Sequence, residues 1–330
     1  MVLWVIKPAK NWDYKIDCVT QSKLNLLEGK MTESSDILLN QPVIVEACEE
    51  FVRRDMLEVR GSFPGLLQDA PMSSTAVVNG LSQQLIYQLQ LIVPDTFVSF
   101  NDLNVDLLDA AFPYVQTPAK QALQRAIQDR GQTMQVNSAY RTIAQQMLLY
   151  NDRINNSNPV APPGTSNHQT GLAIDIEDPR GWESYLMQYG WHPLPGDPPH
   201  FDYIDGGTID LRSKSILAFQ QLWNQNHPDE MIDEDGGFGG QTEDALNRSP
   251  APGFPKAPWD DKPRTLRLAM PRMEGSDVLK LQEGLKKAGM VVGADGEFGP
   301  GTDKAVKEFQ QHQGLVADGI VALKTREQMA

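Results

Sequence analysis

The sequence feature that most constrains the fold is a short motif that occurs twice near the carboxyl end. Asp235–Thr242 and Asp295–Thr302 share aspartate, glycine, phenylalanine, glycine and threonine at matching places. Such internal repeats are typical of small duplicated modules. Each copy follows an amphipathic stretch, Ile216–Trp223 or Val278–Ala288, and its threonine is a suitable N-cap for a second helix. The sequence therefore predicts two small helical modules after residue 210.

A proline-rich segment separates the two copies. Ser249–Arg272 contains six prolines, which lack a backbone donor and cannot sustain a helix. We expect this segment to be an extended linker. The whole chain has 330 residues, and at about 150 residues per domain this leaves room for two domains and a third small module.

Charge and hydropathy exclude several classes of protein. The net charge is −14, from 29 basic and 43 acidic residues, so we expect no binding to nucleic acid or to anionic lipid. No apolar run approaches the roughly 18 residues of a membrane span, so we expect no integral membrane segment. Cys18 and Cys48 are too few for a disulfide scaffold. The first residues lack a basic region and a small-residue cleavage site, so we expect no signal peptide.

Helix and strand patterns alternate through the middle of the chain. Helical periodicity is found between Asn101 and Arg130, with Pro118 suited to a first turn and Gly131 to the end of a helix. A strand over Thr133–Ser138, a helix over Ile143–Arg153, a loop over Asn155–Asn167 and a strand over Leu172–Ile176 are predicted to follow. Near the amino end, strands are expected at 2–6 and 43–47 and a helix at 46–58.

Three of the five histidines, His168, His192 and His200, lie within 33 residues of one another. His168 ends the predicted loop, Asp175 is on the polar face of a strand, and His200 begins what reads as a neighbouring strand, so the three side chains could converge. Two imidazoles and a carboxylate would give Zn²⁺ three protein ligands and leave a fourth position open, as catalysis requires. Taken singly, each residue is more simply a cap or a surface group. His192 is either a hydrogen-bond donor near the site or a strand-edge residue.

An arginine lies just upstream of these residues. Ser138–Thr142 follows a predicted strand, and the Arg141 guanidinium could bind a carboxylate or a developing oxyanion.

Three separated motifs together resemble the VanY-like D-alanyl-D-alanine carboxypeptidases. These are Ser138–Thr142, His168–Asp175 and Asp197–His200, in the order found in that family, and the resemblance covers roughly residues 101–205. The family consists of zinc peptidases that share a fold with lysostaphin-type enzymes and the hedgehog amino-terminal domain. The resemblance implies a similar fold here.

The resemblance also implies roles for individual residues. His168, Asp175 and His200 would bind zinc, and Asp197, three residues before His200, would be the general base. The substrate-binding residues would be Arg141, Ser138 and Tyr140. Many carboxypeptidases of the family have glutamate where this chain has Asp197, whereas aspartate is familiar in a branch that includes phage L-alanyl-D-glutamate endopeptidases. A carboxylate of either length can act as the base.

The repeats resemble the bacterial peptidoglycan-binding module of three short helices. Ser276–Ala330 matches its pattern throughout, including Asp295–Thr302 and Asp318–Gly319. Ser213–Ser249 matches in part, because Gly240 replaces the proline of the turn and Pro250 stops the chain before a third helix.

We therefore predict an α+β fold: a small antiparallel-sheet zinc peptidase domain, small all-α peptidoglycan-binding-like repeats and an unassigned N-terminal region. The predicted parts are an N-terminal region of unknown role (1–95), the peptidase domain (96–210), a partial repeat (211–250), a proline-rich linker (251–272) and a peptidoglycan-binding domain (273–330).

The predicted function is zinc-dependent hydrolysis of the peptide stem of peptidoglycan, with removal of the terminal D-Ala. One alternative is an endolysin-like L-alanyl-D-glutamate endopeptidase, and another is a non-catalytic wall-binding protein. Peptidoglycan is the expected partner, and the cell envelope is the expected location because the substrate is there.

Overall fold

The computed structural model describes residues 4–7, 15–18, 63–71, 74–108, 110–155 and 160–329. The chain divides into two units, residues 1–56 and residues 57–330. In the first, β1 (Trp4–Lys7) pairs antiparallel with β2 (Lys15–Cys18). The strand expected at 43–47 and the helix expected at 46–58 lie outside the described residues.

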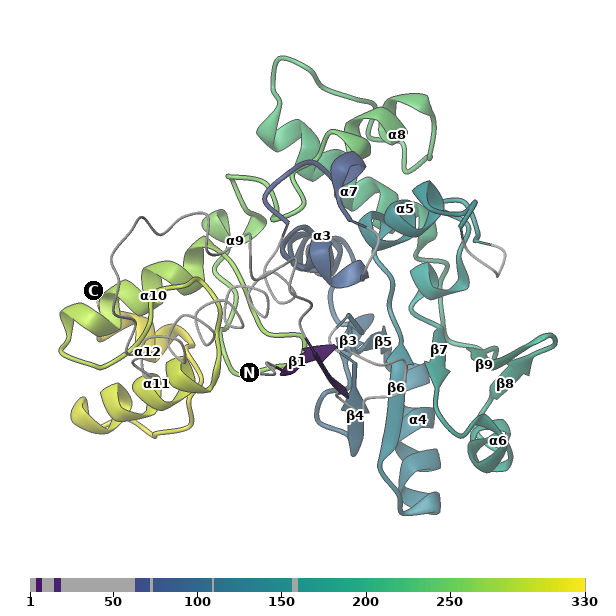
Figure 1. The fold of residues 1–330 in the computed structure, drawn as a ribbon, viewed down its shortest axis with the longest axis horizontal. Helices are drawn as coiled ribbons and strands as arrows, with labels where there is room; N and C mark the ends of the chain where they lie inside the picture. The colour runs from purple at the N-terminus through teal and green to yellow at the C-terminus, as the bar shows by residue number, and fades with distance from the viewer. Residues whose placement is uncertain are drawn as a thin grey trace. The chain divides into compact units, whose positions relative to one another are not determined.

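A five-stranded sheet is the centre of the second unit, and its strands run in the order β4-β6-β7-β9-β8 (Figure 1). All neighbours pair antiparallel except β4 and β6, which are parallel. The five strands are β4 (Val105–Leu107), β6 (Met134–Ser138), β7 (Ala173–Ile176), β8 (Trp191–Leu194) and β9 (Asp197–Tyr203). A separate pair joins β3 (Phe97–Ser99) to β5 (Tyr114–Gln116).

Two helices pack with this sheet around one core. They are α4 (Thr117–Arg130) and α6 (Pro179–Met187). As predicted, Pro118 lies in the first turn of α4, and Gly131, with a φ of 64°, ends it in a left-handed conformation. The buried core includes Leu123, Val136, Ile174, Ile176, Trp191 and Phe201. The sheet and helices confirm the predicted α+β class.

A second core joins the first repeat to helices that precede it. Helices α7 (Arg212–Asn226) and α8 (Gly240–Asn247), which flank the first motif, pack on α3 (Asn79–Ile92) and α5 (Ile143–Asn151). Short 3₁₀ helices η1 (Leu67–Asp69) and η2 (Thr75–Val78) complete this layer. Its buried residues include Leu81, Leu85, Met147, Leu148, Phe219, Leu222, Trp223 and Leu246. The described residues of the first repeat therefore share one core with α3 and α5. The domain boundaries drawn from the sequence stay predictions.

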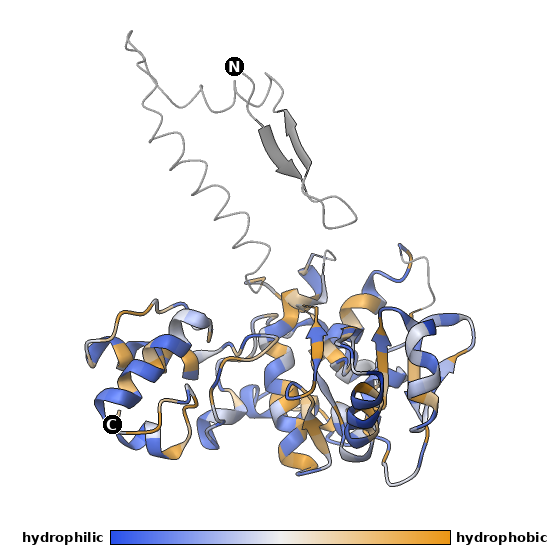
Figure 2. Cartoon of the chain, turned by 90° about the horizontal axis from the view of Figure 1, so that it is seen from below, coloured by the Kyte–Doolittle hydropathy of each residue, from blue (hydrophilic) through white to orange (hydrophobic). Residues whose placement is uncertain are grey.

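The carboxyl end forms the small all-α module expected from the complete repeat. Helices α10 (Ser276–Lys287), α11 (Pro300–His312) and α12 (Leu323–Glu327) surround a core that includes Leu281, Phe298 and Phe309. Hydrophilic and hydrophobic residues alternate along these helices, as the blue and orange segments of Figure 2 show. Among the described residues, no helix has the length and apolarity needed to cross a membrane.

A buried glutamine holds each repeat turn together. Gln282 donates to Asp295 (2.8 Å) and Thr302 (3.0 Å) and accepts from the Gly296 amide (2.8 Å). Gln220 makes the same bonds within the first motif. Gln310 makes them to Asp318, Gly319 and Thr325, so the turn occurs three times, whereas the sequence analysis found the Asp-to-Thr motif twice, in one complete and one partial repeat.

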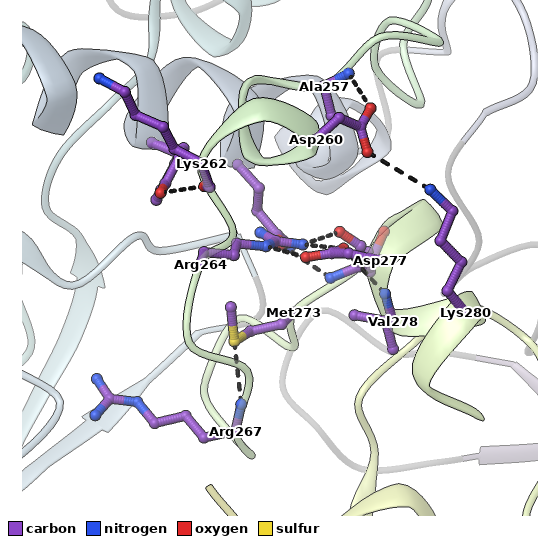
Figure 3. Close-up of polar contacts among 12 residues, drawn as sticks. Ala257, Asp260, Lys262, Arg264, Arg267, Met273, Asp277, Val278 and Lys280 are labelled. Atoms are coloured by element: carbon purple, nitrogen blue, oxygen red, sulfur yellow. Dashed lines mark hydrogen bonds and ion pairs between the residues drawn. The ribbon is translucent and has the colours of Figure 1, made fainter. Parts of the chain in front are cut away.

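The proline-rich segment differs from the extended linker expected, because much of it is packed. It contains the short helix α9 (Pro258–Asp261), and Phe254, Trp259 and Leu266 are buried. Figure 3 shows Arg264 of this segment beside Asp277 of α10, at 2.9 Å. Apolar side chains between the prolines supply the burial that holds the segment in place.

The shared core predicts that a substitution in the first repeat will loosen α5. Phe219→Ala removes a fully buried ring, which typically costs about 3–5 kcal/mol. Hydrogen–deuterium exchange should therefore increase across 143–151. The matched control is Phe309→Ala in the carboxyl-terminal core, which should leave that peptide unchanged. Equal protection of 143–151 in the Phe219 variant and the native protein would contradict the shared core.

Candidate metal centre

Three elements bring His168, Asp175 and His200 together. His168 is in the 3₁₀ helix η3 (Asn167–Thr170), Asp175 is in β7 and His200 is in β9. Asp175 lies directly opposite His200 in the antiparallel register, so the two side chains point to the same face of the sheet. One ligand atom from each of the three residues lies within 4.8 Å of the others.

The turn between η3 and β7 depends on a glycine. Gly171 has a φ of 68°, and a Cβ there would approach the Phe97 ring to 3.2 Å. Only glycine adopts this left-handed conformation without steric cost. It returns the chain from His168 into β7, four residues before Asp175.

Each histidine turns one ring nitrogen toward Asp175 and the other toward a separate hydrogen-bond acceptor. His168 Nε2 is 3.2 Å from Asp175 Oδ2, and His200 Nδ1 is 3.0 Å from Asp175 Oδ1. His168 Nδ1 is 2.8 Å from the Ala139 carbonyl oxygen, and His200 Nε2 is 3.0 Å from Asp202 Oδ1. A carbonyl oxygen only accepts, so Nδ1 of His168 carries the hydrogen and leaves Nε2 available as a ligand.

The charges of the cluster shift its pKa values in opposite directions. Burial alone would raise the pKa of Asp175, but hydrogen bonds from His168 and His200 hold it well below its usual range. Burial would lower the pKa of His200, yet Asp175 and Asp202 outweigh this and raise it to about 9. Burial and the Arg141 charge lower the pKa of His168. Without a metal, the cluster therefore pairs an ionised Asp175 carboxylate with a protonated His200 imidazole.

Arg141 lies beside the cluster and is held by both its backbone and its side chain. Its amide donates to the His168 carbonyl at 3.2 Å. Its guanidinium donates to Ser138 Oγ and Gln146 Oε1, both at 3.3 Å, and lies 3.7 Å from Asp175 Oδ2. Burial lowers the pKa of Arg141, which the charges of Asp175 and Asp197 oppose.

Helix α5 begins immediately after this arginine. Thr142 Oγ1 accepts from the Gln145 amide at 3.2 Å, and Gln145 Oε1 accepts from the Thr142 amide at 3.1 Å. This reciprocal capping box fixes where the helix starts. It therefore also fixes the backbone from which the Arg141 side chain extends.

Asp197, predicted as the general base, is the first residue of β9 and is half-buried. It forms no ion pair with any residue in the described part of the chain. Its charge opposes the effect of burial on the pKa of Arg141. His192 lies on the edge strand β8, opposite Asp202.

Ser138 and Tyr140, both predicted to bind substrate, have different surroundings. Ser138 is opposite Asp175 in the β6–β7 register and contacts Arg141. Tyr140 is only 3% exposed, and its ring lies 4.5 Å from that of Phe97, edge to face. Burial raises the pKa of its hydroxyl, against the effect of the nearby Ser215. The structure thus supports a packing role for Tyr140 and gives no support to direct substrate contact.

The sequence analysis missed Asp202 and Gln146. Asp202 follows His200 by two residues, so in a strand its side chain points to the same face. Gln146 lies in the first turn of α5, five residues after Arg141. A histidine-x-aspartate pattern in a predicted strand could have indicated the first of these, whereas the second depends on how α5 packs.

Two family models match parts of the chain. Residues 114–192 match the family model VanY, described as D-alanyl-D-alanine carboxypeptidase. Residues 274–329 match the family described as "Putative peptidoglycan binding domain". The chain contains a VanY-type domain. The VanY match includes His168 and Asp175 and ends before Asp197 and His200.

Several curated relatives are similar to parts of this chain. The "Probable N-acetylmuramoyl-L-alanine amidase" of Bacillus licheniformis is 35% identical over 133 residues, 38% of this chain and 36% of the relative. The spore cortex-lytic enzyme of Bacillus cereus is 43% identical over 56 residues, 17% of this chain and 22% of that enzyme. The chain thus spans about a third or less of the length of these relatives.

One solved structure is also similar, that of the LdcB LD-carboxypeptidase. It is 17% identical with a TM-score of 0.28, and the match covers 47% of this chain and 78% of that one.

The His200 pKa predicts how the stability of the metal-free protein depends on pH. The folded value of about 9 lies above the ordinary value of 6.5, so protonated His200 stabilises the fold fully below pH 6.5. This contribution is lost as the pH rises toward 9. Urea unfolding in the presence of a chelator should show the decline, and His200→Gln should remove most of it. A native protein and a variant with parallel stability profiles from pH 6 to 10 would contradict the assignment.

Proposed function

We propose that this protein is a zinc-dependent peptidase that hydrolyses the peptide stem of peptidoglycan, as a D,D-carboxypeptidase that removes the terminal D-Ala. The observation that supports this most is the cluster of His168, Asp175 and His200. Two imidazole nitrogens and a carboxylate converge there, and a separate acceptor holds the far side of each ring.

The donor set fits zinc. Two histidines and one carboxylate are a common protein ligand set for catalytic zinc, which keeps a further position open. One candidate ligand atom from each of the three residues lies within 4.8 Å of the other two. When bound, zinc would supply a Lewis acid that activates water and polarises the scissile carbonyl.

The remaining chemistry belongs to Asp197 and Arg141. Asp197 Oδ would take a proton from the attacking water and later deliver one to the leaving amine. Arg141 would bind the terminal carboxylate of the stem, because its planar guanidinium matches that group. Ser138 and Gln146 already contact the guanidinium, so little side-chain freedom is lost when substrate binds.

A second candidate is cleavage inside the stem, as in L-alanyl-D-glutamate endopeptidases. Asp197 favours this endopeptidase activity, because aspartate at this position is familiar in the endopeptidase branch of the family that the chain resembles. A non-catalytic wall-binding protein is a weaker candidate, because the candidate ligands, base and arginine are all present in the chain, and the three candidate ligands lie together. Under either peptidase reading the partner is peptidoglycan and the place of action is the cell envelope.

Product analysis tests the proposal and the base together. Mass spectrometry of muropeptides should show loss of one terminal D-Ala, and a chelator should abolish this loss.

Asp197→Asn should retain zinc and lower kcat by roughly 10²-fold, the usual scale for a general acid–base group. Fragments cut within the stem would replace the carboxypeptidase by the endopeptidase. An Asn variant with undiminished turnover would show that Asp197 is not the general base.

Wall binding by the carboxyl-terminal module gives a separate prediction. Removing residues 274–329 should leave cleavage of small soluble peptides intact and reduce sedimentation with insoluble peptidoglycan. The loss should change little with salt, because the net negative charge of the chain does not drive the attraction. The truncation should include Arg264→Met, because Arg264 would otherwise lose Asp277 and leave a buried charge unpaired. Unchanged pelleting would show that the module does not target the wall.

A further inference from the structure

Asp202 contacts His200 but is not one of the three candidate metal ligands, His168, Asp175 and His200. It follows His200 by two residues in β9, so both side chains lie on one face of the sheet. Its Oδ1 is 3.0 Å from His200 Nε2, the nitrogen on the far side of the ring from Asp175. Its Oδ2 accepts a hydrogen bond from Asn167 Nδ2, also at 3.0 Å. Both carboxylate oxygens are therefore occupied.

We propose that Asp202 is a positioning residue that holds His200 with Nδ1 toward the metal, and that Asn167 in turn holds Asp202. This inference rests on the proposed zinc centre. A carboxylate only accepts, so it retains the hydrogen on Nε2 and leaves the Nδ1 lone pair free for a ligand bond. Its negative charge also makes the imidazole a stronger donor to a cation.

The two histidine ligands differ in how they are supported. His168 is oriented by a neutral backbone carbonyl, that of Ala139, which no side-chain substitution removes. His200 is oriented by a charged side chain that lies on the same strand. The strength of the His200 ligand bond is therefore set by one carboxylate, and a substitution can test it.

Other roles for Asp202 fit the contacts less well. As a general base it would need an oxygen directed at the attacking water, but its two oxygens are directed at His200 Nε2 and Asn167 Nδ2. As a fourth ligand it would need to face Asp175, but it meets the opposite nitrogen of the His200 ring. The group of ligand atoms found within the described residues does not include it.

The test measures zinc affinity of the full chain by competition with a chromophoric chelator. Asp202→Ala should weaken zinc binding by about 10- to 100-fold, the usual effect of losing such an outer partner. Asp202→Asn should also weaken it, because a neutral amide can donate to Nε2 and favour the wrong tautomer. Asp202→Glu should restore part of the affinity, and Asn167→Ala should give a smaller loss.

A spectroscopic readout separates positioning from general destabilisation. The visible absorption bands of the cobalt(II)-substituted protein depend on ligand geometry, so they should shift in Asp202→Ala and recover in Asp202→Glu. Asp205→Asn is the matched control, because Asp205 is an exposed aspartate just beyond the same strand. It should leave zinc affinity and the cobalt spectrum unchanged.

Two results would overturn the inference in distinguishable ways. Folded Asp202→Ala and Asp202→Asn proteins that bind zinc within twofold of the native protein, with native cobalt spectra, would refute the positioning role alone. A native protein that binds no zinc, or a His168→Ala variant that binds it normally, would refute the proposed metal centre and this inference with it.

Discussion

The antiparallel pairing of β7 with β9 is the constraint on which the site depends. This register sets Asp175 directly opposite His200, and the period of two along a strand puts Asp202 on the same face. If the pairing of β7 with β9 shifted by one residue, either Asp175 or His200 would point into the core instead of toward its partner. The buried residues Ile174 and Phe201, which pair on the other face, make such a slip costly because they would become exposed. Burial of the sheet core therefore also fixes the geometry of the polar cluster.

The sequence predicted the elements whose pattern is local. The strand at Met134–Ser138, the helix at Ile143–Asn151 and the strand at Ala173–Ile176 lie within a few residues of their predicted ranges, because each alternates or repeats clearly. Strands β4 and β5 were missed inside a stretch read as helical. Each has only three residues, so neither shows enough alternation to outweigh neighbouring helical periodicity.

Contacts across the fold could not be predicted in the same way. The order of three sequence motifs indicated the candidate histidine and aspartate ligands, but the hydrogen-bond partners of those residues come from other elements. Asn167 reaches Asp202 across 35 positions of sequence, and no local pattern encodes that pairing. The packing of the first repeat was missed for a related reason. An amphipathic stripe on α7 shows that one face is buried, but it does not identify α3 and α5 as the elements that cover it.

Helix α3 contacts both the start of α5 and the carboxyl-terminal module, through the neighbouring residues Ser82 and Gln83. Ser82 Oγ lies 2.8 Å from Thr142 Oγ1 at the start of α5, beside Arg141. Gln83 accepts hydrogen bonds from Arg264 and from the Glu274 amide of the carboxyl-terminal module. Arg264 is 7% exposed, and breaking its pair with Asp277 would leave a buried charge uncompensated. Packing through α3 therefore opposes free movement of the carboxyl-terminal module, so the proline-rich segment is a packed structural connection rather than a flexible tether.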